Sequence, residues 1–380
     1  MKVMCDRSAL LDAINLVSSV VAARSPRPQL TCVLMRASKA DASLTLSGTD
    51  AEMSLVMSSS SVDVQEDGSA LIPADKLRQI IQAHDSEPTL TLECTDDMMT
   101  IRGKDAVYKV YGYSPSDFPE LPELSDDDDA FTVDARDMDQ LIARTIFATA
   151  RENSRYAING VLLNRTGKKI EMVATDGRRL ALARGTASAA NDESDMCIVP
   201  SKALSVLDKL MKAHASDGVR LSVTANQIVA TVLDEAGESI ASLSSNLVEG
   251  TFPPYEDVIP RDQDKKATFD TDVLNSAVRR AALLTNEESR GVRLAFTTDD
   301  GNKLTLSSRA PEMGEAKIDV ELKGYDGDDI EIGFNPAFII DALKIIDDSE
   351  ISLELKNTNK PGLIKSGPDF VYVVMPVNLQ

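Results

Sequence analysis

The sequence contains no tryptophan, and aromatic residues make up only 4% of its 380 positions, so a core must rest on Leu, Ile, Val, Met and Ala. It has no apolar run of the roughly 20 residues that a membrane-spanning helix needs, and charges interrupt its N-terminus too early for a secretory signal. Its four cysteines are widely spaced and include no C-x-x-C pair. This spacing favours reduced thiols over a disulfide framework or a zinc site. We therefore expect a cytoplasmic protein.

Side chains suited to catalysis are also scarce. Only two histidines are present, and the sequence has no P-loop, no G-x-S-x-G and no G-x-G-x-x-G after a predicted strand. The strongest candidate is ATDGRRL, in which Asp176, Arg178 and Arg179 could serve a phosphate-handling hydrolase. The alternative is structural, because Asp-Gly between two strands of alternating pattern is a strong hairpin signal. We favour the hairpin and predict a protein that is not an enzyme and uses no cofactor.

Carboxylates outnumber basic residues in this chain. The formal net charge is −21, and a strongly acidic protein does not bind nucleic acid through its overall charge. The run Asp126–Asp129 could hold a metal ion, but consecutive carboxylates in a linker are usually solvated, so no metal site is predicted. Basic side chains nevertheless gather on the predicted helices: Lys76, Arg78, Arg144, Arg151, Lys202, Lys209, Lys212, Arg279 and Arg280.

Three stretches of the chain open alike, which indicates an internal repeat. In VMCDRSALLDAINLV, FTVDARDMDQLIART and ATFDTDVLNSAVRRA, a short apolar strand leads through an acidic residue into a helix. Leu10, Met138 and Leu274 of these helices align at offsets of 128 and 136, and a later landmark aligns at offsets of 127 and 135. The constant phase predicts three copies of one α+β domain with the order β-α-β-β-β-β-α-β-β-β. Proline-rich acidic linkers separate the copies, which we place at 1–124, 130–252 and 262–380.

Several segments resemble those of the bacterial sliding clamps, the β subunits of the replicative DNA polymerase. They are RYAINGVLL, VATDGRRLAL, LVEGTFPPYEDVIP, NEESRGVRL and YVVMPVNL, in this order, with LTLSGTDAEMSL and IPADKL before them. Together they cover nearly the whole chain. The resemblance implies a processivity factor of DNA replication. Each chain would carry three clamp domains, and two chains would close head to tail into a ring with helices lining the hole and sheets outside.

Such a ring would resolve the conflict with the net charge, because topology rather than counterion release would keep it on duplex DNA. Three positions, Asp75, Glu152 and Ala157, depart from the family pattern and predict a weaker contact with the duplex. The resemblance implies sequence-independent DNA contacts at Arg24, Lys76, Arg151, Tyr156 and Lys202.

Members of this family also hold short peptides from the polymerase, the clamp loader and other proteins in an apolar pocket between the second and third domains. Four positions, Arg178, Asp257, Ser289 and Asn378, depart from the family pattern. They predict a more acidic rim that lacks one aromatic wall. The resemblance therefore leaves open which partner peptides the pocket prefers. The resemblance carries the pocket over to Ile158, Thr175, Gly177, Arg178, Arg179, Leu180, Pro253, Val258, Asn335, Phe338, Pro361, Val373, Val374, Met375, Pro376, Val377 and Leu379.

The last strand of the first predicted domain, in AVYKVYGY, has no obvious cover within its own domain. An uncovered strand edge invites pairing with another chain. The resemblance implies that Tyr108 and Val110 on this strand meet Leu283 and Leu284 of the other copy. We therefore predict a homodimer.

Overall fold

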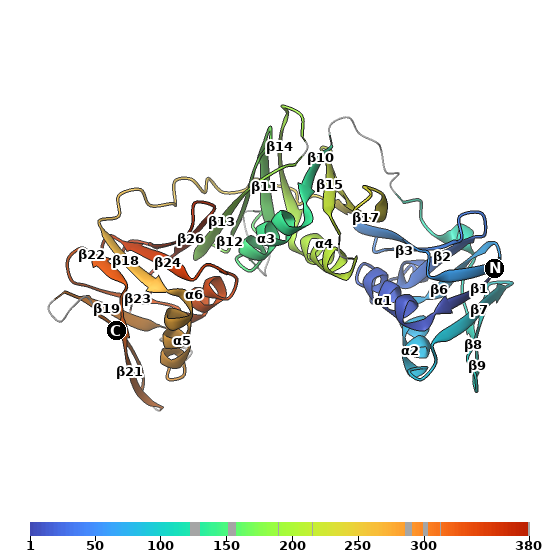
Figure 1. Cartoon of the computed structure of the whole chain (residues 1–380), viewed down its shortest axis with the longest axis horizontal. Helices are drawn as coiled ribbons and strands as arrows, with labels where there is room; N and C mark the ends of the chain where they lie inside the picture. The colour runs from blue at the N-terminus through green and yellow to red at the C-terminus, as the bar shows by residue number, and fades with distance from the viewer. Residues whose placement is uncertain are drawn as a thin grey trace. The chain divides into compact units, whose positions relative to one another are not determined.

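The computed structural model describes residues 1–121, 130–150, 157–188, 190–214, 216–285, 291–298, 303–311 and 313–378. These residues form two compact units (Figure 1). The first comprises Met1–Asp139, Ala187–Glu193 and Lys202–Leu247, and the second comprises Gln140–Thr186, Ser194–Ser201 and Val248–Gln380. The border runs through the middle third of the chain, because that third gives strands to a sheet in each unit. No helix among these residues is long and apolar enough to cross a membrane.

Two antiparallel sheets belong to the first unit. One has the strand order β5-β1-β7-β8-β9 and the other β10-β15-β16-β17-β4-β3-β2-β6. The strands are β1 Lys2–Asp6, β2 Cys32–Ser38, β3 Ser43–Thr49, β4 Met53–Ser59, β5 Val62–Glu66, β6 Gly68–Pro73, β7 Thr89–Thr95, β8 Met98–Arg102, β9 Val107–Tyr111, β10 Phe131–Asp134, β15 Gly218–Val223, β16 Gln227–Leu233 and β17 Ser239–Asn246. The helices are α1 Arg7–Ser18, α2 Ala74–Ala83, α3 Ala135–Ile146, which continues into the second unit, and α4 Ser201–His214.

The second unit also contains two antiparallel sheets. Its sheets have the orders β14-β11-β12-β13-β26-β25-β24-β18-β22 and β21-β20-β19-β23. The strands are β11 Gly160–Thr166, β12 Lys169–Thr175, β13 Arg179–Thr186, β14 Ser194–Pro200, β18 Lys265–Asp270, β19 Val292–Thr297, β20 Lys303–Ala310, β21 Gly314–Glu321, β22 Gly324–Asp326, β23 Ile330–Phe334, β24 Glu350–Leu355, β25 Gly362–Ser366 and β26 Phe370–Val374. The helices are α5 Thr271–Ala282 and α6 Pro336–Leu343.

The first helices of the repeats begin where the sequence predicts. Asp6 and Asp270 cap α1 and α5, because their carboxylates accept the N–H groups of Ala9 at 2.8 Å and Val273 at 3.1 Å. Such a cap contributes about 1 kcal/mol. The apolar faces of α1 and α5 turn inward, and each helix packs against the second helix of its own repeat, α2 or α6 (Figure 1).

The middle repeat has the predicted order of elements, whereas the first and third each contain one strand more. The added strands, β5 and β22, pair with the first strand of their repeat, β1 or β18. The next strand of each lies in the other sheet of its unit. Gly68 and Gly327 follow the added strands with φ of 147° and 136°. Because such angles favour glycine, they let the chain change sheets there. In the middle repeat, the Ser188 N–H donates to Thr132 O in the corresponding place.

A turn with the same hydrogen bonds recurs in the first two repeats. Asp50 Oδ1 accepts the N–H groups of Glu52 and Met53, and Thr49 Oγ1 accepts the N–H of Ala51. Thr175 and Asp176 bond in the same way after β12. The ATDG segment is therefore a structural hairpin turn, as the Asp-Gly signal predicts.

The repeats are joined through strands of equivalent position. The last strand of the middle repeat, β17, pairs with β4 of the first repeat. The last strand of the third repeat, β26, pairs with β13 of the middle repeat. By the same correspondence, β9 of the first repeat is equivalent to β17 and β26, and β21 of the third repeat is equivalent to β4 and β13. Among the described strands, each of these two has a neighbour on one side only, so both are sheet edges. The predicted domain boundaries stay a prediction.

Candidate functional site

A cavity of about 180 Å³ opens in the second unit. Four segments form it: the chain just before β11, the β12–β13 hairpin, the chain after Phe252, and the end of β26. All the lining residues except Pro254 and Tyr255 are among the positions that the family resemblance indicates. The cavity is lined by Ile158, Thr175, Gly177, Arg178, Arg179, Leu180, Pro253, Pro254, Tyr255, Val258, Val373 and Met375.

The floor of the cavity belongs to a hydrophobic cluster of the second unit. Leu180 and Val373 are buried there, and their strands β13 and β26 pair side by side. Phe252 and Tyr255 pack against the same cluster from the segment that follows the middle repeat. A hollow with such a floor and a few polar groups at its edge is the usual form of a site that receives an apolar side chain.

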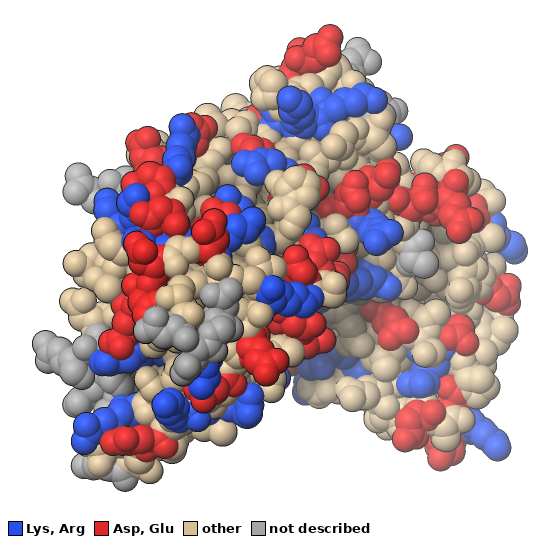
Figure 2. Space-filling view, turned by 60° about the vertical axis from the view of Figure 1, so that its left-hand side comes forward, with Lys and Arg blue, Asp and Glu red and all other residues tan. Residues whose placement is uncertain are grey.

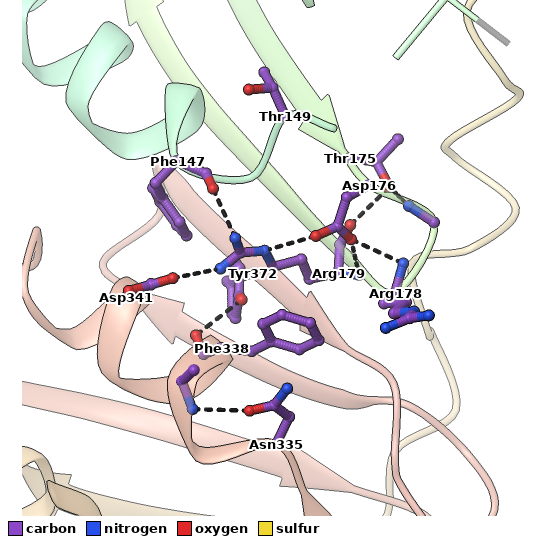
Figure 3. Close-up of polar contacts among 12 residues, drawn as sticks. Phe147, Thr149, Thr175, Asp176, Arg178, Arg179, Asn335, Phe338, Asp341 and Tyr372 are labelled. Carbon is purple, nitrogen blue, oxygen red and sulfur yellow. Dashed lines mark hydrogen bonds and ion pairs between the residues drawn. The ribbon is translucent and has the colours of Figure 1, made fainter. Parts of the chain in front are cut away.

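Arg179 ties one wall of the cavity together (Figure 3). Its guanidinium donates to Asp176 Oδ2 at 3.0 Å, to Asp341 Oδ2 at 2.9 Å and to Phe147 O at 2.8 Å. The same group lies over the rings of Phe147 and Phe338, 5.4 and 4.6 Å from their centroids. Burial alone would lower the pKa of Arg179, but its bond to Asp341 and the charge of Asp176 outweigh that effect and raise it. Arg179 thus stays charged and connects β13 with α6.

This network leaves the hydrolase alternative without support. One oxygen of Asp176 holds the turn and the other binds Arg179, whose guanidinium nitrogens all donate within the protein. Arg178 is exposed beside them. Groups of three or more side chains that could hold a metal ion are absent from the described part of the chain, and the run Asp126–Asp129 lies outside it.

The other predicted pocket residues surround the cavity without all lining it. Asn335 caps α6 by accepting the N–H of Ala337 at 3.0 Å. Val374 is completely buried, and the N–H of Val377, which follows Pro376, donates to Gly333 O at 2.9 Å. Leu379 lies outside the described residues. The chain after β26 is thereby held to β23, and the N–H of Met375 joins it to the hairpin by donating to Arg178 O at 2.9 Å.

A second hollow lies next to the cavity and shares Val258 and Met375 with it. Pro361 lines this hollow, together with the exposed carboxylates of Glu256, Asp257 and Asp262. Asn378 is exposed, and Ser289 lies outside the described residues. Arg261 and Lys360 line the same hollow, so it carries charges of both signs, and the more acidic rim stays a prediction.

Tyr255 and Pro254 are the lining residues that the sequence did not indicate, and Tyr255 makes the polar contact. Its hydroxyl donates to Glu171 Oε2 at 3.3 Å, and its ring stands edge-on to Phe252. Burial, reinforced by the charge of Glu171, raises the pKa of Tyr255. The repeated aromatic-Pro pair at the end of each of the first two repeats was the available signal, because Phe118 packs into the first unit as Phe252 packs into the second.

The predicted DNA-contact residues lie in several parts of the chain. Arg24 is exposed in the loop after α1, and Lys76 is exposed on α2. Lys202, at the start of α4, binds Asp50 Oδ2 at 2.6 Å. Arg151, Glu152 and Tyr156 lie outside the described residues. Two positions expected to weaken the contact differ in their surroundings: Asp75 is exposed and pairs with Arg78, whereas Ala157 is buried.

Charges of both signs alternate on the face shown in Figure 2, and neither sign covers it continuously. Several of the basic side chains are paired with carboxylates across the structure, such as Arg184 with Glu171 and Lys365 with Glu354. The overall negative charge of −21 therefore coexists with locally balanced surfaces.

The predicted joint residues lie at the two sheet edges. Tyr108 is partly exposed on β9 and contacts His84 edge-on, whereas Val110 is buried in its own sheet. Sequence reasoning missed Tyr111, which is 80% exposed on the same strand. Leu283 is 73% exposed just after α5, the helix that packs on β21. Leu284 follows it and is half-buried.

The chain matches three family models in succession. They describe the N-terminal, central and C-terminal domains of the DNA polymerase III beta subunit and match residues 1–122, 132–254 and 256–378. The chain is 32% identical over 375 residues to a beta sliding clamp of Pseudomonas aeruginosa, with 98% of each chain covered. It is 31% identical over 381 residues to that of Escherichia coli, with 100% of each covered.

Solved structures agree with these matches. A DnaN sliding clamp from Pseudomonas aeruginosa superposes with a TM-score of 0.90 at 31% identity, over 100% of both chains. A sliding clamp from Bacillus subtilis also reaches 0.90 at 24% identity over 100% of both chains, which supports the fold alone.

Proposed function

This chain belongs to the family of DNA polymerase III beta subunits, the beta sliding clamps, and we propose that two copies close into a ring that encircles duplex DNA. The family's role as a processivity factor of DNA replication applies to the chain. The observation that carries the ring proposal is the pair of unmatched sheet edges, β9 and β21.

The geometry of the repeats favours closure by two copies. Within the chain, the last strand of one repeat pairs with a strand of the preceding repeat, namely the third strand after that repeat's first helix. In this way β17 pairs with β4, and β26 pairs with β13. The first repeat then has β9 to spare, and the third has β21. Pairing β9 of one copy with β21 of the other would repeat the same joint. A head-to-tail contact of this kind closes once both copies have used both edges.

Exposed apolar side chains at these edges support the joint. Val107 and Tyr111 on β9 are 56% and 80% exposed, and Met313 beside β21 is 58% exposed. Together with Leu283, they would be removed from water when the two edges pair. Burying such side chains contributes about 25 cal/mol per Å² of apolar surface.

We assign the cavity of the second unit to partner peptides of the polymerase, the clamp loader and other replication and repair proteins. Its apolar floor fits a leucine or phenylalanine side chain, and Met375 and Val258 at its edge are exposed enough to be covered by a bound chain. The protein would act by tethering, without catalysis of its own, and in the cytoplasm, where these partners work on DNA.

Retention on closed DNA tests the ring. The purified protein is dissociated, allowed to reassemble in the presence of a nicked circular duplex, and separated from free protein by gel filtration. We expect twice the mass of one chain in solution and co-elution with the circle. Cutting the circle once should release the protein, because a ring slides off an end. Equal retention before and after the cut would contradict the proposal.

A further inference from the structure

Three lysines lie along the solvent-exposed face of α4. Lys202, Lys209 and Lys212 are exposed, while the opposite face of the helix is buried. Two of the three are paired. Lys202 Nζ binds Asp50 Oδ2 at 2.6 Å, and Lys212 Nζ lies between Asp139 at 2.9 Å and Asp208 at 2.7 Å.

Lys209 differs from its neighbours on the helix. It makes no ion pair with a carboxylate of the described residues, although it lies on the same helix and is exposed like the other two. The helix therefore presents one uncompensated lysine and two compensated ones on a single face. Lys209 can therefore be compared directly with the paired lysines, Lys202 and Lys212, of the same helix.

Asp50 is held in place independently of the lysine. Its Oδ1 accepts the N–H groups of Glu52 at 3.1 Å and Met53 at 2.8 Å, so the carboxylate is fixed by its own turn, and Oδ2 remains for Lys202. The side chain of Asp50 is 18% exposed. The equivalent Asp176 uses its oxygens in the same way, because Oδ1 holds the turn and Oδ2 binds Arg179. A pre-positioned carboxylate loses little side-chain entropy when it pairs.

The site at Lys212 is more acidic than a simple pair. Two carboxylates share one lysine, and burial together with the neighbouring Asp139 raises the pKa of Asp208. The pKa of Lys212 is raised by its bonds to Asp208 and Asp139. Lys212 therefore stays charged, and its charge is balanced locally.

Because a lysine that already has a carboxylate partner gains little from a phosphate, these pairs affect DNA contact. Each phosphate that a free lysine neutralises releases counterions and makes binding steeper in salt. We propose that Asp50, and Asp139 with Asp208, are positioning residues that act as built-in counter-ions on α4, withholding Lys202 and Lys212 from duplex phosphate. The inference rests on the proposed function. Its consequence is weak, salt-tolerant binding to the duplex, which lets the clamp slide along the DNA.

Asp50→Asn is the first test. Asparagine keeps a side-chain oxygen for the two turn hydrogen bonds and removes only the charge. The affinity of the dimer for a linear duplex is measured by fluorescence anisotropy from 50 to 200 mM salt. One released lysine should steepen the slope of log affinity against log salt by about 0.9. The ratio of the variant's DNA affinity to that of the wild type should therefore fall about 3.5-fold between 50 and 200 mM salt.

Glu354→Gln is the matched control. Glu354 also pairs with a lysine, Lys365 at 2.8 Å, and is 17% exposed, but it lies on β24. The substitution changes the net charge by the same amount and releases a lysine on a sheet. An equal change of slope in both variants would mean that only total charge matters and would overturn the inference.

Lysine substitutions complete the cycle. In the otherwise unchanged protein, Lys202→Gln should weaken DNA binding less than Lys209→Gln does. In the Asp50→Asn background, Lys202→Gln should abolish the gained slope. If it lowers affinity equally in both backgrounds, Asp50 does not withhold the lysine.

The inference can fail while the proposed function stands. Wild-type protein retained on circles, with an Asp50→Asn slope equal to its own, refutes the counter-ion role alone. Wild-type protein that is not retained on circles refutes the ring itself. Circular dichroism and gel filtration of each variant separate a change in DNA contact from a loss of folding or assembly.

Discussion

Replacing Arg179 with methionine removes the group that joins the β12–β13 hairpin to α6. The side chain of Arg179 is only 10% exposed. Its loss would leave Asp176 and Asp341 without their cation and Phe147 O without its donor. Removing one partner of a buried ion pair costs roughly 3–5 kcal/mol. Because Asp341 is 36% exposed and water can solvate it, we expect Arg179→Met to lower the local stability by about 3 kcal/mol.

Two aromatic contacts contribute to this figure. The cation lies between the rings of Phe147 and Phe338, and each such contact is worth about 0.5–1 kcal/mol. Methionine would keep apolar contact with both rings, so most of the loss comes from the hydrogen bonds. Arg179→Lys keeps the charge but cannot form all three bonds from one planar group, so its effect should be intermediate.

The assay must report on local stability, because a chain with several domains does not unfold in one step. Hydrogen–deuterium exchange of the α6 amides in the peptide-free protein should accelerate by about two orders of magnitude for Arg179→Met. Affinity for a polymerase-derived peptide should fall at least tenfold. Arg178→Met, an exposed neighbour with the same change of charge, serves as control and should alter both within a factor of two or three. Unchanged exchange of α6 in Arg179→Met would refute the anchoring role.

Three further changes test other parts of the structure. Leu283→Ala with Leu284→Ala should yield monomers in analytical ultracentrifugation at low concentration, since truncating a leucine buried at the joint costs roughly 2–5 kcal/mol; an unchanged dimer mass would exclude this surface. Deleting 375–380 should abolish peptide binding in a fluorescence titration while the dimer persists, because Met375 lines the cavity; full-strength binding would mean that peptides dock elsewhere. Ala51→Gly should stabilise the first unit locally by roughly 0.5–1 kcal/mol and slow hydrogen–deuterium exchange of the β3 and β4 amides, because alanine there has a φ of 78°; faster exchange would contradict this.

Sequence periodicity predicted the elements well because each repeat carries the same short-range signals. The cap residues Asp6 and Asp270 and the buried positions of α1 and α5 are fixed by contacts within a few residues of one another. The additional strands β5 and β22 were not predicted. They are short, and their pairing depends on a change of sheet at Gly68 and Gly327 rather than on a local apolar pattern.

The candidate site was accessible from the sequence only through the family resemblance. Leu180 and Val373 read as ordinary strand residues, and pairing of β13 with β26 brings them together from distant positions. The enclosure of Arg179 by Phe147 and Phe338 has no local signal, because the three residues come from different elements. The same holds for Lys202, whose partner Asp50 is 152 positions away. Basic residues on predicted helices therefore overstate the free positive charge.

The aspartate turn shows how one repeated motif acquires different uses. In each of the first two repeats, one carboxylate oxygen of the aspartate accepts the backbone N–H groups of the turn. The second oxygen is free to bind whichever cation the surrounding fold supplies: Lys202 of α4 in one case and Arg179 of the hairpin in the other. In the third repeat the segment SSRAPEMGEA has no aspartate, and the Met313 N–H bonds to Ala310 O instead. Beside that turn, Arg309 Nε pairs instead with Glu315 Oε1 at 3.3 Å. Divergence of the repeats thus changes which side chains carry the local charge without changing the fold.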